Sequence, residues 1–384
     1  MREAAEKQLL GLDLQELTAI ALELGQPAYR GQQLFEALYR QRVEALDQVT
    51  TLPQHFRAQL AGAYSVGSPA IEKKFVSRDG TVRYLVGFSD GQSIETVWMP
   101  EGDEGEQGDG SEAGNETVSH DKNVVRPPSD RTGGFHRATI CVSSQAGCAV
   151  DCQFCMTALL GLLRNLSAGE IVGQILRVLA DQKISPETQR LNLVFMGQGE
   201  PFLNYDNFMK AVRLLVEGVG IAESRMTVST SGIVPRIYDY GAEPVRPKLA
   251  ISLNASNDPQ RDQVMPINRK WNLEKLLAAA REFPLRPRER LTFEYVLLGG
   301  VNDAVQNARE VTELLRGLKA KVNLIALNPG PEIPFSMPEE QRVLQFQQVL
   351  VRAGIPTFIR RPRGRDIYAA CGQLKRADMV ELAT

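Results

Sequence analysis

The sequence has 384 residues, of which 43% are hydrophobic and 23% charged, with a formal net charge of −2. This composition is typical of a globular protein with room for one large domain and one or two small ones. It contains no run of about 18 apolar residues that could cross a membrane. The charged start lacks the apolar stretch of a secretion signal, so we expect a cytoplasmic protein without a membrane partner. We also expect a monomer.

The first part of the chain has a helical pattern. Apolar residues recur at helical spacing in 14–24 and 31–46, with breaks at Gly25, Pro27 and Pro53. We therefore predict a small helical N-terminal domain over residues 1–68.

Residues 69–100 alternate between apolar and polar side chains instead. The pairs Asp79-Gly80 and Asp90-Gly91 are hairpin signals. Three short antiparallel strands are predicted here, as an extension between the helical start and the rest of the chain.

The next segment is strongly acidic. Residues 101–130 hold nine Asp/Glu and two Lys/Arg, whereas the rest of the chain carries 42 Lys/Arg against 37 Asp/Glu. We predict that 101–133 is a disordered insertion, because it is too polar to bury a core. The C-terminal segment 356–384 is basic, which suits a nucleic-acid partner but is also typical of a solvated surface.

Between residues 134 and 355, strand-like runs alternate with amphipathic helices. Ser167 and Glu170 form a capping box at the start of one of these helices. The alternation indicates an α/β fold with a parallel sheet, which we interpret as a partial (βα)6-type parallel barrel. The predicted strands cover 138–143, 191–196, 226–230, 248–253, 291–298 and 321–327.

The five cysteines indicate metal or redox chemistry, because they are odd in number and clustered. Cys148, Cys152 and Cys155 form a C-x3-C-x2-C motif just after a predicted strand. Three thiolates can bind one [4Fe–4S] cluster and leave one iron open for a ligand. A structural zinc site would need a fourth ligand, and no second cysteine pair is present. The alternative to a cluster is a zinc site or three unrelated thiols.

The motif and the strings that follow it resemble one known family. C-x3-C-x2-C, with Phe154 before the last cysteine, is similar to the signature of the radical S-adenosylmethionine superfamily. The wider pattern resembles the dual-specificity RNA adenine-C2 methyltransferases, which act on 23S ribosomal RNA and on transfer RNA. The strings that carry this likeness are CVSSQAGCAVDCQFCMTALLG, RNLSAGEI, FMGQGEP, VSTSG, ISLNASND, LNPGP and RGRDIYAACGQL.

The resemblance implies a radical S-adenosylmethionine methyltransferase with a [4Fe–4S] cluster on Cys148, Cys152 and Cys155. It further implies that Cys371 accepts a methyl group, that Cys141 resolves the resulting protein–RNA crosslink, and that Glu95 accepts a proton. It also implies an RNA-binding accessory role for residues 1–68 and an electron donor of the flavodoxin or ferredoxin type. The adenine C2 carbon has no lone pair to attack a methyl sulfonium, which explains the need for radical chemistry.

Cofactor contacts are expected at one edge of the predicted sheet. Ligands of parallel α/β proteins collect at the carboxyl ends of the strands. Asn254 stands where the family commonly has His, although Asn can still form a hydrogen bond. The residues that follow the predicted strands and match S-adenosylmethionine contacts of the family are Gly199, Glu200, Ser231, Ser252, Leu253, Asn254 and Asn328.

Three alternatives remain open at this level. The first is the sister activity that methylates adenine at C8 with the same cysteines. The second is another radical enzyme class, such as a sulfur-inserting or peptide-modifying one, which would have no reason to keep both Cys141 and Cys371. The third is a non-catalytic RNA-binding protein stabilised by a metal.

Overall fold

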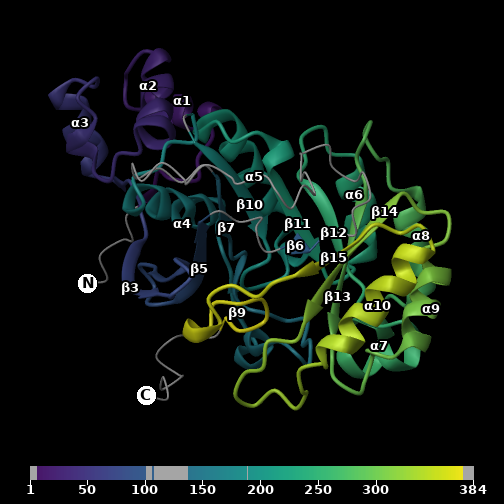
Figure 1. Cartoon of the computed structure of the whole chain (residues 1–384). Coiled ribbons are helices and arrows are strands. Elements are labelled where there is room, and N and C mark those ends of the chain that lie inside the picture. The colour runs from purple at the N-terminus through teal and green to yellow at the C-terminus, as the bar shows by residue number, and fades with distance from the viewer. Residues whose placement is uncertain (1–6, 101–105, 108–136, 188, 375–384) are drawn as a thin grey trace, which may run out of the picture.

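The computed structural model describes residues 7–100, 106–107, 137–187 and 189–374. In this part of the chain, one curved sheet of 11 strands has the order β3-β4-β5-β7-β10-β11-β12-β13-β14-β15-β6. Figure 1 shows the N-terminal helices as a separate group at the upper left and the helices α7 to α10 on the right of the sheet. No helix within these residues is long and apolar enough to cross a membrane.

In the order of this sheet, the strands from β7 across to β15 run parallel and form its main part; β8 and β9 belong to a separate pair. Most residues of β13 are buried on both faces, as expected for a parallel strand covered by helices. This confirms the predicted α/β fold, to which the structure adds β15. The parallel strands are β7 (Arg137–Cys141), β10 (Arg190–Phe195), β11 (Met226–Thr230), β12 (Lys248–Ser252), β13 (Leu291–Leu297), β14 (Ala320–Ala326) and β15 (Thr357–Arg360).

The helices lie between these strands in the chain, as the alternating pattern predicts. They are α4 (Ala168–Asp181), α5 (Tyr205–Leu214), α6 (Val234–Gly241), α7 (Asp258–Val264), α8 (Leu273–Glu282), α9 (Val305–Leu314) and α10 (Glu340–Arg352). The predicted capping box of α4 is confirmed: the Glu170 backbone N donates to Ser167 Oγ over 3.2 Å, and the Ser167 backbone N donates to Glu170 Oε2 over 2.8 Å.

The antiparallel extension continues the main sheet. It consists of β3 (Ala70–Val76), β4 (Val82–Gly87) and β5 (Ser93–Pro100), and β5 pairs with β7 so that Val97 stands opposite Cys141. The predicted turns hold, since Gly80 and Gly91 have φ angles of +82° and +79°, which glycine adopts without strain. The extension therefore lies beside the strand that carries Cys141.

The N-terminal domain contains α1 (Leu14–Glu23), α2 (Tyr29–Glu36) and α3 (Gln54–Ala61), as predicted. It also has a short parallel pair, β1 (Lys7–Gln8) with β2 (Tyr64–Ser65), which helical spacing did not indicate. Its buried side chains belong to the same hydrophobic core as those of the main sheet. An ion pair of 2.7 Å between Glu16 and Lys210 joins α1 to α5.

Of the predicted disordered insertion 101–133, the structure describes only residues 106 and 107. These form β6 (Glu106–Gln107), which pairs antiparallel with Ile359 and Arg360 of β15. The rest of this prediction, and the part of the basic C-terminal segment beyond residue 374, lie outside the described residues.

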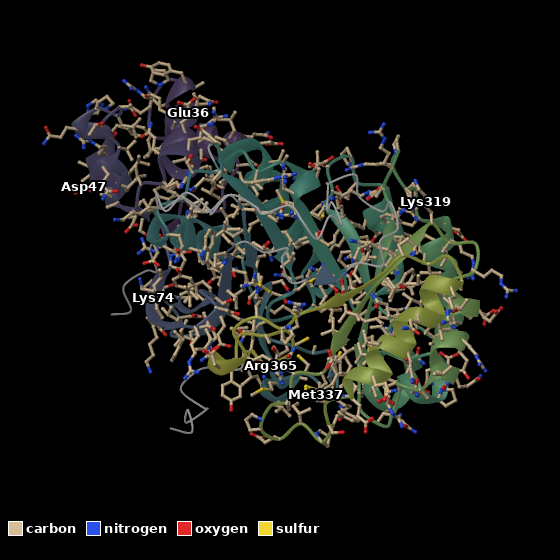
Figure 2. The ribbon with its side chains drawn as sticks, viewed as in Figure 1. Glu36, Asp47, Lys74, Lys319, Met337 and Arg365 are labelled. Carbon is tan, nitrogen blue, oxygen red and sulfur yellow. The ribbon has the colours of Figure 1, made fainter. Side chains whose placement is uncertain are left out.

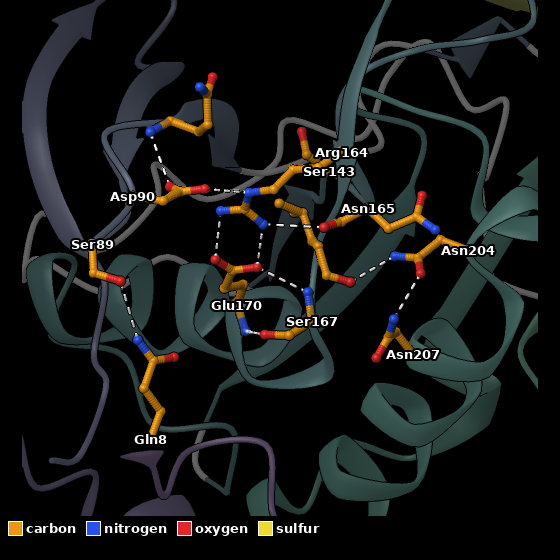
Figure 3. Close-up of polar contacts among 12 residues, drawn as sticks. Gln8, Ser89, Asp90, Ser143, Arg164, Asn165, Ser167, Glu170, Asn204 and Asn207 are labelled. Carbon is orange, nitrogen blue, oxygen red and sulfur yellow. Dashed lines mark hydrogen bonds and ion pairs between the residues drawn. The ribbon is translucent and has the colours of Figure 1, made fainter. Parts of the chain in front are cut away.

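One polar network joins the extension to the start of α4 (Figure 3). Arg164 donates to Asp90 in the turn between β4 and β5 over 2.5 Å, and to both carboxylate oxygens of Glu170 over 2.7 Å. Nearby, Gln8 of the N-terminal domain donates to Ser89 over 3.4 Å. The network fixes the position of β9 (Leu162–Asn165), the strand that carries Arg164.

This network makes the stability of the folded protein decrease at acid pH. The hydrogen bond from Arg164 lowers the pKa of Asp90, so the ion pair stabilises the folded state above the unfolded pKa of about 3.9. We expect Asp90→Asn to lower the free energy of unfolding by less than about 1 kcal/mol near pH 7, because the pair is partly exposed. Urea unfolding at about pH 7 and about pH 3 should show this difference vanish as the pH falls through the folded-state pKa. A difference that persists unchanged at low pH would contradict it.

Candidate active site

The three-cysteine motif lies in a loop with a rigid base. β8 (Gln145–Gly147) pairs with β9 and closes this base. Gly147 has a φ of +76°, and a Cβ atom there would lie 1.9 Å from the carbonyl oxygen of Gly161. Only glycine allows this approach, which lets the Cys148 backbone N donate to the same oxygen over 2.8 Å. The first cysteine of the motif is therefore positioned by the backbone.

Cys148, Cys152 and Cys155 all line one cavity of about 170 Å³. Burial raises the pKa of Cys148 to about 12. Burial, and then the nearby Cys155 and Cys148, raise the pKa of Cys152 well above its usual range. Thiols in such surroundings become thiolates only when a strong positive charge, such as that of bound iron, stabilises the anion.

The donor set fits an iron–sulfur cluster. Three thiols share the cavity, and none of the described residues that line it is a histidine. Within the described residues, no three His, Cys, Asp or Glu side chains converge closely enough to hold a single metal ion. A four-iron cube is wider than one ion, so its thiolate ligands stand further apart; the three-cysteine set would also leave one iron open.

Six of the seven expected cofactor residues line this same cavity: Gly199, Glu200, Ser231, Ser252, Asn254 and Asn328. Glu200 is 4% exposed, and its carboxylate accepts hydrogen bonds from the backbone N of Ser231 (2.7 Å) and of Phe202 (3.0 Å). Burial raises the pKa of Glu200, and these hydrogen bonds oppose that shift. Gly199, with a φ of +95°, lets the chain pass against Gln145 at the base of the cysteine loop.

Leu253 does not line the cavity. It is fully buried, and its backbone carbonyl accepts from Arg261 Nε over 3.0 Å. Arg261 also donates to the carbonyl oxygens of Ser231 (2.8 Å) and Ser252 (2.9 Å). This buried guanidinium therefore fixes the backbone of three expected cofactor residues at once.

Asn254 lies on the cavity, but its side chain already makes hydrogen bonds within the protein. Its Oδ1 accepts from the backbone N of Val296 over 2.8 Å, and its Nδ2 lies 3.1 Å from the sulfur of Met265. Its φ is +56°, a left-handed conformation that Asn and His adopt more readily than most residues. The backbone conformation thus favours an Asn at this position.

The segment that carries Cys371 is tied to both the cysteine loop and the sheet. The Met156 backbone N donates to the Gly372 carbonyl over 2.8 Å, and Thr157 Oγ1 donates to the Leu374 carbonyl over 2.7 Å. Asn328 Nδ2 donates to the Cys371 carbonyl over 3.3 Å. The Asn328 Oδ1 atom is buried on the cavity without a hydrogen-bond partner in the described structure, which leaves an acceptor for a bound ligand.

The structure brings Cys141 and Cys371 to one second cavity of about 340 Å³. Both are free thiols, Cys141 buried in β7 and Cys371 exposed. Burial, and then the nearby Cys371, raise the pKa of Cys141. Cys371 also lines the first cavity, together with Glu294 and Asn328, so the two cavities meet at this thiol.

Glu95 lies elsewhere. It is fully buried in β5 and lines neither of these two cavities. Its Oε1 lies 3.0 Å from Nη1 of Arg83, and the same Nη1 lies 3.5 Å from the carbonyl oxygen of Tyr368, close to Cys371 in the chain. The Arg83 guanidinium also lies over the Phe75 ring, 4.4 Å from its centroid. Glu95 therefore does not face solvent.

Three buried charged residues of the site were not anticipated. Arg83 and Arg261 are 1% and 0% exposed, and Glu294, 6% exposed, accepts from Asn323 Nδ2 over 2.8 Å on the adjacent strand. Glu294 had a sequence signal, since a lone acid within the apolar run LTFEYVLL is unusual for a buried strand. Arg83 had the same signal, since it is the lone charge in the strand VRYLVG, whereas Arg261 had none, because it stands among polar neighbours.

Comparison with known proteins places this site among RNA-modifying enzymes. Two family models match: the radical SAM superfamily over residues 142–311 and the ribosomal RNA large subunit methyltransferase N-terminal domain over 7–66. The chain is 69% identical to the probable dual-specificity RNA methyltransferase RlmN of Koribacter versatilis, over 94% of this chain and 99% of that protein. For the RlmN of Syntrophobacter fumaroxidans these values are 42%, 94% and 96%.

A solved structure agrees with these matches. The crystal structure of a radical SAM methyltransferase from Sphaerobacter thermophilus gives a TM-score of 0.83 at 41% identity, covering 97% of this chain and 99% of that chain.

The buried ion pair of Glu95 leads to a prediction about stability. We expect Glu95→Gln to lower the free energy of unfolding by about 3–5 kcal/mol, because it leaves the Arg83 charge buried without its partner. The double variant Arg83→Met with Glu95→Leu should lose much less, because no uncompensated charge remains. Urea unfolding of the two variants measures both values. Full stability of Glu95→Gln, with loss of activity alone, would instead assign Glu95 to catalysis.

Proposed function

Because this chain belongs to the RlmN family of dual-specificity RNA methyltransferases, we propose that it methylates C2 of adenine in 23S ribosomal RNA and in transfer RNA through a methylated Cys371. One observation carries the proposal: Cys371 lies where the cavity of the three-cysteine motif meets the cavity that contains Cys141. A thiol at this junction has access to a cofactor on one side and to a substrate on the other.

Cys148, Cys152 and Cys155 would hold the [4Fe–4S] cluster, and the residues along the ends of the strands would hold S-adenosylmethionine. When bound, the cluster would supply the electron for reductive cleavage of the cofactor, which starts the radical chemistry. Glu200 and Asn328 offer acceptors for the cofactor, and the apolar lining, which includes Phe154, Met265 and Leu327, excludes water.

Cys371 accepts a methyl group from one S-adenosylmethionine and loses its thiol proton. Cys371 would then hold its S-methyl group where a second bound S-adenosylmethionine could supply hydrogen-atom abstraction, so that the methylene carbon on the Cys371 sulfur could add to C2 of adenine. The adduct would then give one electron back to the oxidised cluster and the C2 proton to a base, which leaves adenine joined to Cys371 by a thioether. The Cys141 thiolate would attack the sulfur of Cys371; the S–CH2 bond breaks, the methylene carbon takes up a proton to become the methyl group, and the disulfide that remains must be reduced by an external thiol or reductase. The shared cavity of the two cysteines supports this division of roles.

Other parts of the proposal rest on the family alone. These are the electron donor of flavodoxin or ferredoxin type and the RNA-binding role of the N-terminal domain; the cytoplasmic location and the monomeric state are expectations from the sequence. Family membership also supports C2 over C8 as the methylated carbon. It removes the alternatives of a peptide-modifying radical enzyme and of a non-catalytic RNA-binding protein. The proton-accepting role of Glu95 stays a prediction. Its ion pair with Arg83 supports a second role, in which Glu95 helps to position the segment that carries Cys371.

Cys371→Ala tests the methyl acceptor. We expect the anaerobically purified variant to keep its iron and sulfide and to form no methylated adenosine in ribosomal or transfer RNA. Mass spectrometry of digested RNA measures the product and separates 2-methyladenosine from 8-methyladenosine in the wild type. Normal product formation by the variant would remove Cys371 from the mechanism, and an 8-methyl product from the wild type would change the proposed position.

Cys141→Ala tests the resolving thiol. We expect this variant to methylate Cys371 and to accumulate a covalent protein–RNA species, because the thiol that releases the RNA is missing. Denaturing gel electrophoresis with labelled RNA detects the crosslink, and the Cys371→Ala variant is the control that should form none. Release of methylated RNA at the wild-type rate would exclude a resolving role for Cys141.

A further inference from the structure

Three arginines are buried among the described residues, and one of them has no ionic partner. The guanidinium of Arg83 lies 3.0 Å from the carboxylate of Glu95. That of Arg246 lies 2.7 Å from the carboxylate of Glu289. Arg261, which is 0% exposed, forms no ion pair in the part of the chain that the structure describes. A buried charge without an opposite charge is costly, so its presence points to an anion that the protein binds.

The donors of Arg261 all end on neutral groups. Besides the three carbonyl oxygens described above, Nη1 donates to Asn268 Oδ1 over 3.0 Å. Asn268 Nδ2 in turn donates to carboxylate oxygens of Asp258 over 3.0 Å and of Asp262 over 2.7 Å. Both acids therefore act on Arg261 only from behind this amide, and both are half-buried, so water screens them in part. The protein itself leaves much of the charge of Arg261 uncompensated.

Arg261 lies close to the cysteine loop. Its helix α7 ends at Val264, whose carbonyl accepts from the backbone N of Gln153, the residue after Cys152, over 3.0 Å. Val264 and Met265 also pack against Cys152 in one apolar cluster. Burial raises the pKa of Cys152, and the positive charge of Arg261 acts against that shift. The guanidinium and the cysteine motif are therefore within electrostatic reach of each other.

The guanidinium keeps its charge in these surroundings, and an iron–sulfur cluster is an anion that suits it. Burial lowers the pKa of Arg261 to about 10, and the nearby Cys152 opposes this shift, so the group stays protonated near neutral pH. A [4Fe–4S] cube held by three thiolates is a net anion, and one-electron reduction makes it more negative. A fixed positive charge in a buried setting therefore stabilises the reduced cluster more than the oxidised one.

We propose that Arg261 is the counter-charge of the iron–sulfur cluster and raises its reduction potential, which brings the cluster within reach of the electron donor. The inference rests on the part of the proposed function that assigns the cluster to the three cysteines. One electron passes from a donor of the flavodoxin or ferredoxin type to the cluster, and the fixed guanidinium stabilises the added negative charge. Every nitrogen of Arg261 already donates within the protein, so it is a positioning residue that acts through its charge.

The test measures the reduction potential of the cluster in the full-length, anaerobically reconstituted protein. Arg261→Gln and Arg261→Met remove the charge, whereas Arg261→Lys keeps it. The potential comes from a redox titration followed by electron paramagnetic resonance. The titration is done without S-adenosylmethionine, so that the carboxylate of the cofactor plays no part.

Two exposed cations provide matched controls. Arg269→Gln removes the same charge at the end of the short helix η7 (Pro266–Arg269), which follows α7, at a position where water screens it. Lys319, labelled at the surface in Figure 2, directly precedes β14. It therefore lies at the amino-end edge of the parallel strands, opposite the edge at which the cysteine loop follows β7. Lys319→Gln removes a charge on the far side of the sheet.

We expect both uncharged variants to have a reduction equilibrium on the order of tenfold less favourable, which for a one-electron couple is a potential about 59 mV more negative. Arg261→Lys should stay close to the wild type, because a charge at the same place acts in the same way. Arg269→Gln and Lys319→Gln should match the wild type. Iron and sulfide contents, measured on the same samples, show that each variant holds its cluster.

A wild-type potential in Arg261→Gln or Arg261→Met would overturn the proposal. So would an equal shift in Arg261→Lys, because a purely structural arginine depends on its hydrogen bonds and not on its charge. Failure of both uncharged variants to fold, while Arg261→Lys folds, would assign Arg261 to folding and would also overturn it.

The two proposals fail separately. A wild type that holds the cluster but methylates no RNA would refute the methylation and leave the effect of Arg261 on the potential in place. Unchanged potentials in an enzyme that methylates RNA normally would refute only the role of Arg261.

Discussion

The backbone of Met156 donates a hydrogen bond to Gly372, and the side chain of Thr157 donates one to Leu374. These two bonds tie the end of the cysteine motif to the segment that contains Cys371. Asn328 holds the same segment against the end of β14. The reactive thiol therefore keeps its place relative to the cluster ligands, and both cavities depend on these contacts because Cys371 and Gly372 line each of them.

The extension supports the same segment from the other side. Asp366 accepts from Ser77 Oγ over 2.5 Å, and Asp79 accepts from the Gly364 backbone N over 3.0 Å. Arg83 reaches the Tyr368 carbonyl while it balances the buried charge of Glu95. The three antiparallel strands thus act as a support for the segment that carries Cys371, and the buried ion pair adds specificity at the cost of desolvating two charges.

The sequence by itself determined the parallel α/β core, the three antiparallel strands and the cysteine motif. Strands and amphipathic helices have periodic patterns in the sequence, and the spacing of Cys148, Cys152 and Cys155 is local. The residues after each parallel strand lie at one edge of the sheet, and this rule predicted the positions of Glu200, Ser231 and Asn328. Only the tertiary structure decided that Leu253 is buried outside the cavity and that Arg261 donates hydrogen bonds to the backbone carbonyls of Leu253, Ser231 and Ser252. It also decided that Glu95 pairs with Arg83 and placed Cys371 beside Cys141. These contacts join residues far apart in the chain, and no local pattern records which distant partner a buried charge or a thiol will meet.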